Sequence, residues 1–263
     1  MNGKKRQVIT KYMVFYELRN VTGNPFVHIF GIGMPIFMAV LITRIALSEV
    51  SDAAIAKTVS TSVFLGIGAM IPMATVLMGY AVRQAQDFEK GIPERMRLFG
   101  IRDCVTICNR AVSELIFMTA AFALYFFAGI LFIDLEAPAF SGIVLYILCM
   151  LFFSITCFML GHAIAALVKR FSITYCIVMM VYFALMILGG MMGISYENMP
   201  AAMQAAAKLL PVTYFNKDFI TIWTGGIYNF VPMVQSYLFF GAIGGILLFA
   251  ASNRGVGRAH EKV

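Results

Sequence analysis

Side chains that could carry catalysis, metal binding or nucleotide binding are sparse in this sequence. Cys104 and Cys108 lie one helical turn apart, but no further cysteine or histidine follows in a zinc-binding spacing, so we expect a reduced structural pair and no metal site. His162 lies deep in an apolar segment, where we expect a hydrogen-bonded structural histidine. No phosphate loop, HExxH or GxSxG pattern occurs. We therefore predict that this chain is not an enzyme, binds no ATP and carries no cofactor.

The segment 83–110 is the one strongly charged part of the interior of the sequence, with six Lys and Arg residues between two apolar runs. Basic residues near the ends of membrane segments are retained in the cytoplasm, so this segment should be a cytoplasmic loop. Pro93 suits the first turn of a short helix and Gly100 its end, while Met96 and Phe99 share one face. We predict an amphipathic helix at the membrane surface that docks a soluble partner; the alternative is an ordinary basic loop.

Composition places this loop in an integral membrane protein. Hydrophobic residues make up 61% of the 263 residues and the mean hydropathy is +0.86, whereas soluble domains are about 45–50% apolar. The net charge of +7 would suggest a nucleic-acid partner in a soluble protein. Here the basic residues flank apolar runs, so we expect a lipid bilayer and no nucleic acid as partner. No pair of carboxylates lies within an apolar segment, which argues against intramembrane hydrolases and proton-coupled carriers.

Six apolar segments are long enough to cross a bilayer, and they predict an all-α membrane protein with a single transmembrane domain. The predicted spans are 25–47, 59–82, 111–133, 140–168, 173–194 and 229–251. Residues 1–24 have apolar positions at three- and four-residue steps between charges, so we expect an interfacial helix. Residues 195–228 are too polar to span, and we expect a helical segment that lies on or re-enters the outer face.

The distribution of basic residues predicts the orientation of these spans. With both termini in the cytoplasm, sixteen of the twenty Lys and Arg residues are cytoplasmic, and Arg44, Lys57, Lys208 and Lys217 are outside. This strong bias favours a multi-pass protein of a plasma membrane, that of a bacterium, with cytoplasmic termini.

Two regions of the sequence resemble type-2 ABC transporter permeases. In the first, Lys90-Gly91 is followed by Glu94-Arg95-Met96 and then by Gly100-Ile101-Arg102. The second, more specific region has Met199-Pro200 and then the turn 211–215, Pro-Val-Thr-Tyr-Phe, before the last span. Gly100 stands where the family usually has proline. The resemblance covers essentially the whole chain, and it implies an N-terminal elbow helix in 1–24 and a coupling helix in 83–110.

The resemblance also implies partners and contact residues. A separate ATP-binding subunit would hold ATP and magnesium, and a second permease chain, identical or related, would complete the pathway. The ATPase-coupling residues implied are Phe88, Glu89, Gly91, Glu94, Arg95, Arg97, Phe99 and, in the short link between the fourth and fifth spans, Arg170. The outer-face motif consists of Met199, Pro200, Pro211 and Tyr214.

The residues that line a pathway are predicted from spacing. Met179, Tyr182 and Met186 share one face of the fifth span and, with Met70 and Met73, would form an adaptable apolar wall. The alternative is ordinary helix packing. The first interpretation predicts an exporter of an amphipathic or lipid-like substrate, such as a drug, peptide, lipid or lipid-linked polymer. The alternative function is a non-transporting membrane protein, a receptor or immunity factor, whereas an intramembrane enzyme lacks a catalytic constellation.

Overall fold

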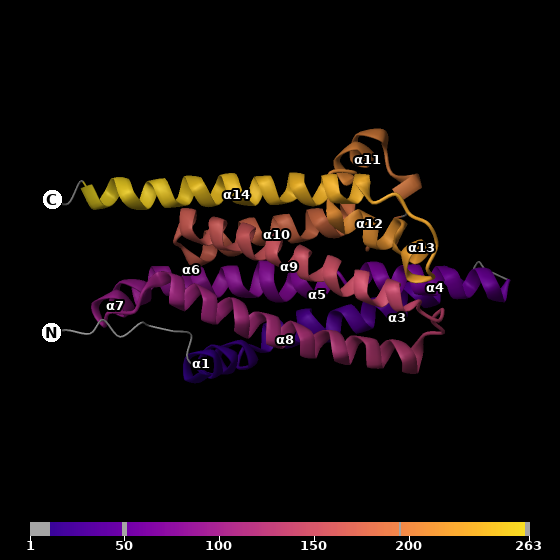
Figure 1. Cartoon of the computed structure of the whole chain (residues 1–263), viewed down its shortest axis with the longest axis horizontal. Coiled ribbons are helices and arrows are strands. Elements are labelled where there is room, and N and C mark those ends of the chain that lie inside the picture. The colour runs from indigo at the N-terminus through magenta and orange to yellow at the C-terminus, as the bar shows by residue number, and fades with distance from the viewer. Residues whose placement is uncertain (1–10, 49–51, 195, 261–263) are drawn as a thin grey trace.

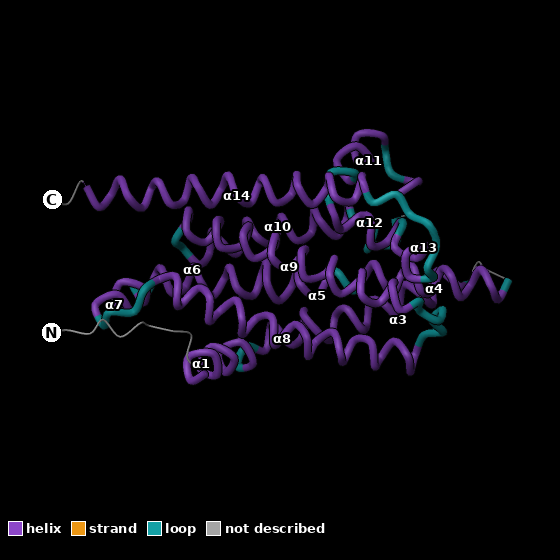
Figure 2. The backbone as a smooth tube through the Cα atoms, in the orientation of Figure 1, coloured by secondary structure: helices purple, strands orange, loops and turns teal. Residues whose placement is uncertain are grey.

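The computed structural model describes residues 11–48, 52–194 and 196–260. Within these ranges the chain is helical and contains no strand. The long helices run along the long axis of the molecule, as Figures 1 and 2 show. Six of the described helical segments are long and apolar enough to cross a membrane. They are Pro25–Leu47, Ala53–Glu89, Asp103–Phe132, Phe140–Val168, Phe171–Leu188 and Val231–Asn253. The prediction of an all-α protein with six spans is confirmed.

The first span follows α1 (Lys11–Thr22), a helix that packs on α8 (Asp103–Phe132). The span consists of α2 (Pro25–His28), the π-helical turn η1 (Ile29–Gly33) and α3 (Met34–Leu47). It begins sharply because the Asn24 side chain accepts a hydrogen bond from the Phe26 amide at 3.1 Å, and Pro25 suits the first helical position. The π turn lies just before Pro35, whose missing N–H interrupts the regular hydrogen-bond ladder.

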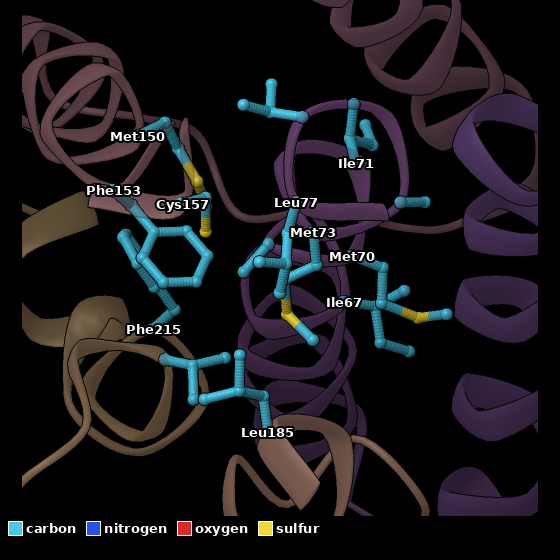
Figure 3. Packing of buried hydrophobic residues seen from close by; sticks show 14 of the residues in the cluster. Ile67, Met70, Ile71, Met73, Leu77, Met150, Phe153, Cys157, Leu185 and Phe215 are labelled. Atoms are coloured by element: carbon cyan, nitrogen blue, oxygen red, sulfur yellow. The ribbon is translucent and has the colours of Figure 1, made fainter. Parts of the chain in front are cut away.

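The second span is the centre of the molecule. It runs through α4 (Ala53–Ile67), α5 (Met70–Pro72), the π-helical η2 (Met73–Tyr80) and α6 (Ala81–Glu89). Its most apolar stretch is 89% buried inside the chain, against 22–44% for the other five spans. Figure 3 shows the resulting core, in which Met73 and Leu77 lie near Phe153 of α9. The other spans therefore surround this one and turn most of their apolar surface outward.

The remaining spans pack as neighbours around this centre. α9 (Phe140–Val168) contacts both the second span and α14 (Val231–His260). α10 (Phe171–Leu188) follows α9 after only two residues and packs on α9 and α6. Lys169 takes a left-handed conformation, φ 55°, which reverses the chain in that short link.

Helix bounds differ from the predicted spans where helices leave the apolar region. The second span and α8 extend through charged residues on both sides of the predicted loop 83–110, because Gln, Glu and Arg are good helix formers in water. α14 likewise continues past residue 251. α10 is shorter than predicted, since Gly189 caps it and Gly190 has φ 73°.

Residues 196–223 form four short helices at the end of the molecule where the teal loops gather in Figure 2. They are η3 (Tyr196–Asn198), α11 (Ala201–Ala207), α12 (Pro211–Lys217) and α13 (Phe219–Trp223). α12 and α13 are mostly buried and pack on α4, and α13 also packs on α9. The Ser62 hydroxyl donates to the Asn216 carbonyl at 2.6 Å, and the Trp223 indole donates to the Glu136 carbonyl at 3.1 Å. This segment thus enters the bundle instead of lying loosely over it.

Candidate docking surface

The helix α7 (Ile92–Leu98) is a short element at the end of the molecule where α14 finishes (Figure 1). Glycines with positive φ stand on either side of it: Gly91 at 66° and Gly100 at 79°. An L side chain is strained in this region, so these two positions let the chain turn sharply out of α6, form one helix, and turn again into α8. α7 contacts both of those helices.

An ion pair fixes α7 against the start of α8. The Arg97 guanidinium donates from Nε to Asp103 Oδ1 at 2.8 Å and from Nη2 to Oδ2 at 2.5 Å. These hydrogen bonds to Asp103 raise the pKa of Arg97. The bidentate geometry is specific, but both side chains are about half exposed, so its net contribution to stability is below about 1 kcal/mol.

The outer side of α7 presents apolar side chains to solvent among charges. Leu98 is 87% exposed and Phe99 is 82% exposed. Glu94 and Arg95 are exposed beside them. Adjacent exposed leucine and phenylalanine side chains with a charged rim are typical of a protein interaction site. Leu98 was not singled out from the sequence, although its adjacency to Phe99 was the available signal.

The short link between α9 and α10 lies at the same end of the molecule as α7. The Phe171 amide donates to Glu89 Oε2 at 2.9 Å, and Lys169 Nζ lies 5.7 Å from the centre of the Phe88 ring. Arg170 between them is exposed. The α7 surface is therefore defined here as the exposed residues Glu94, Arg95, Leu98, Phe99 and Arg170. Phe88 and Gly91 are half-buried, and Glu89 is exposed but accepts a hydrogen bond from the Phe171 amide. These three residues support the α7 surface from behind and are not counted in it.

A buried charge network lies beneath the α7 surface. Arg110 of α8 donates to Glu17 of α1 at 3.1 Å and to Asp87 of α6 at 2.5 Å, and it also bonds to Gln84. The side chain of Arg110 is 12% exposed and that of Glu17 is 8% exposed. One guanidinium thus ties together α1, the α6 end of the second span, and α8.

Their spacing in the sequence predicts that Glu114 pairs with Arg110, one helical turn away, and this prediction is wrong. Glu114 instead pairs with Arg83 of α6. A basic residue four positions before an acidic one is the weaker helical order, and Arg110 finds two carboxylates on other helices. The other oxygen of Glu114 is buried without a hydrogen-bond partner among the described residues.

The family model of the ABC-2 type transporter matches residues 9–224, from just before α1 to just after α13. The chain belongs to the ABC-2 type transporter family. It is therefore a multi-pass membrane permease subunit of an ABC transporter, a family that associates with an ABC ATP-binding subunit. A comparison with curated proteins gives no match. The match includes the charge network, α7 and the segment of four short helices.

The predicted pathway residues lie mostly inside the permease. Met70, Met73, Tyr182 and Met186 are buried, the first two in the core shown in Figure 3, and Met179 is half-buried. In this conformation the four buried side chains face other parts of the same chain. Their assignment to a pathway stays a prediction, which requires a conformation in which the spans separate.

The outer-face motif has local structural roles in the permease. Met199 is buried and Pro200 precedes α11, while Pro211 occupies the first position of α12. The Tyr214 hydroxyl donates to the Lys208 carbonyl at 2.9 Å and closes the turn between the two helices. Burial raises the pKa of Tyr214, which keeps the phenol neutral as a donor.

His162 has the structural role that the sequence predicted. Its Nδ1 lies 2.6 Å from the Tyr80 hydroxyl, and its ring stacks near those of Tyr80 and Phe158. This bond joins α9 to the second span and gives the buried Tyr80 hydroxyl the partner that a buried polar group needs.

Proposed function

We propose that the permease forms half of the translocation pathway of an exporter, and that a separate ATP-binding subunit docks on the α7 surface. In this proposal α7 and both termini lie in the cytoplasm of a bacterial cell. The observation that carries it is the exposed Leu98–Phe99 pair, fixed between two glycine turns and surrounded by charged side chains. ATP and magnesium would be held by the partner, and a second permease chain would supply the other half of the pathway.

The contacts of α7 supply the means of coupling. A displacement of α7 would be transmitted to the second span through Gly91. It would be transmitted to α8 through the Arg97–Asp103 ion pair. The same displacement would be transmitted to α10 through the hydrogen bond between Glu89 and the Phe171 amide, and to α1 through the ion pair of Arg110 with Glu17. Contacts that change with nucleotide state at this surface would therefore bias the position of four helices together.

An amphipathic or lipid-like cargo is the substrate class we propose. The support is the number of flexible methionine side chains, 19 in the chain, of which Met70, Met73 and Met186 lie in the core where spans would separate. Methionine adapts to apolar ligands of different shapes because it is unbranched and polarisable.

The test is co-purification and coupled ATP hydrolysis with the cognate ATP-binding subunit, using Leu98→Asp and Phe99→Asp. The matched control is Ile227→Asp, which places the same charge on a fully exposed apolar residue in the loop after α13, at the end of the molecule away from α7 (Figure 1). We expect Leu98→Asp and Phe99→Asp each to weaken the affinity for the ATP-binding subunit by at least about tenfold, as the loss of an interface anchor does. The Ile227→Asp control should keep the affinity of the unaltered chain.

Retention of the ATP-binding subunit by both α7 variants would show that docking occurs elsewhere. Efflux of cargo by the permease without any ATP-binding subunit would refute an ATP-driven exporter. Protection of cells against a toxic peptide with no nucleotide dependence would instead support a receptor or immunity factor.

A further inference from the structure

A groove of about 520 Å³ lies between α8 and α9, on the part of the permease remote from α7 and the charge network. Its walls are side chains of both helices, and one end is closed by the turn 135–138 and by Trp223 of α13. The volume is in the range of sites that enclose small ligands. Neither the pathway prediction nor the docking proposal uses this groove.

The groove opens toward the surroundings of the helices, which are bilayer hydrocarbon for membrane spans. Ile130 of α8 is 74% exposed and Ile147 of α9 is 54% exposed, and both line the groove. Its inner side is aromatic: Tyr146 is buried, and the ring of Trp223 stacks on that of Phe126 at 6.2 Å between centres. A lipid acyl chain therefore reaches this groove directly from the bilayer. Because the chain is apolar, its entry breaks no polar contact.

Three charged side chains lie at or beside the closed end of the groove: Glu136 lines it, Asp134 precedes the lining residue Leu135, and Lys57 precedes Thr58, which bonds to Glu136. Lys57 Nζ lies 3.2 Å from Asp134, and both side chains keep exposed surface, so the ammonium retains free donors. Two residues farther on, Glu136 lines the groove. Its carboxylate accepts a hydrogen bond from the Thr58 hydroxyl, but no cation pairs with it in the part of the chain that the structure describes.

We propose that this groove binds a phospholipid with a primary-amine headgroup, phosphatidylethanolamine. One acyl chain lies along Phe126, Ile130 and Ile147. The lipid phosphate approaches Lys57, and the ammonium approaches Glu136 and Asp134, so opposite charges meet at both positions. The proposal uses only the membrane spans and the groove, and it holds whether or not the permease exports.

The experiment measures which lipid remains bound to the full chain after extraction from vesicles of equal phosphatidylethanolamine and phosphatidylglycerol, by native mass spectrometry. We expect a preference for phosphatidylethanolamine of about twofold to fivefold, the ratio that a partly exposed ion pair supports. Glu136→Gln keeps an acceptor for Thr58 and should bring the ratio close to one.

A second variant tests the groove independently of charge. Ala123→Trp fills the groove from an exposed position and should remove bound phospholipid of both kinds. The matched control is Ile155→Trp, at an exposed position of α9 that does not line the groove, and it should retain the lipid. A melting curve for each variant tests whether it is folded.

Equal retention of both lipids by the unaltered chain would overturn the headgroup assignment, and full retention by Ala123→Trp would overturn the site. Dodecylamine serves as a soluble amphipathic cation. If Glu136→Gln and Ala123→Trp weaken only the binding of dodecylamine and leave phospholipid retention unchanged, the groove binds soluble cations and the phospholipid proposal is wrong.

Discussion

Replacing Arg110 with methionine removes the cation that Glu17 of α1 and Asp87 of α6 share. Glu17 of α1 and Asp87 of α6 then keep their negative charges, with side chains only 8% and 23% exposed, and Gln84 loses its donor. Breaking a buried ion pair from one side costs about 3–5 kcal/mol, because the partner left behind is desolvated and unpaired. We expect a loss of stability in that range, with the detachment of α1 as its structural result.

The matched control is Arg97→Met, which breaks the ion pair with Asp103 at the surface. Those side chains are 58% and 45% exposed, so the same chemical change should cost below about 1 kcal/mol. The assay is thermal unfolding of both purified variants in the same detergent. A protease-sensitivity time course on α1 shows whether that helix detaches first.

Restoring the charge balance provides a second comparison. The triple variant Arg110→Met, Glu17→Gln, Asp87→Asn carries no buried charge at this site, and it should recover most of the stability that Arg110→Met loses. A melting temperature for Arg110→Met equal to that of Arg97→Met would refute the reasoning, since burial would then not distinguish the two sites. Failure of the triple variant to recover would show that hydrogen bonds, and not charge burial, dominate.

Two further predictions concern orientation and packing. Cys104 is exposed at the start of α8, so a membrane-impermeant maleimide should label it in inverted vesicles and not in intact cells. Cys104→Ser is the control. Labelling of intact cells would place α7 outside and exclude docking of a cytoplasmic subunit. A Cβ added at Gly142 would lie 2.7 Å from the Cα of Trp223, so Gly142→Ala should destabilise the permease by about 1–3 kcal/mol. At Gly245 an added Cβ would lie 4.0 Å from Met159 Cε, so Gly245→Ala should be neutral or stabilising by up to about 1 kcal/mol. Equal melting temperatures for the Gly142→Ala and Gly245→Ala variants would contradict the packing of α13 on α9.

The sequence predicts the spans well because a bilayer imposes a length of apolar chain, and it predicts α7 because Gly91, Pro93 and Gly100 are specific local signals. It cannot predict which apolar residues form the core. Lipid-facing and buried positions of a span are equally apolar, so Met70, with no exposed surface, and Met180, 62% exposed, look alike in sequence.

The charge network was missed for a related reason. Arg110 and Glu114 are close in sequence, and spacing on one helix favours pairing them. The actual partners, Glu17 and Asp87, lie 93 and 23 positions away from Arg110, and only the packing of three helices brings them together. A useful signal was the position of Glu17 within the helix that the sequence predicts to be interfacial, since a carboxylate near an apolar face requires a cation.

The burial of the second span constrains how the proposed coupling can operate. Moving α7 moves α6 with it, and α6 continues into a helix whose apolar stretch is 89% buried. Displacing that helix within its own chain would repack the core, which close-packed interiors resist. The ion pair between Arg97 and Asp103, the hydrogen bond between Glu89 and the Phe171 amide, and the ion pair between Arg110 and Asp87 add to this resistance. Force applied at the α7 surface should therefore move the permease chain as one body, and the opening and closing of a pathway should take place between two chains.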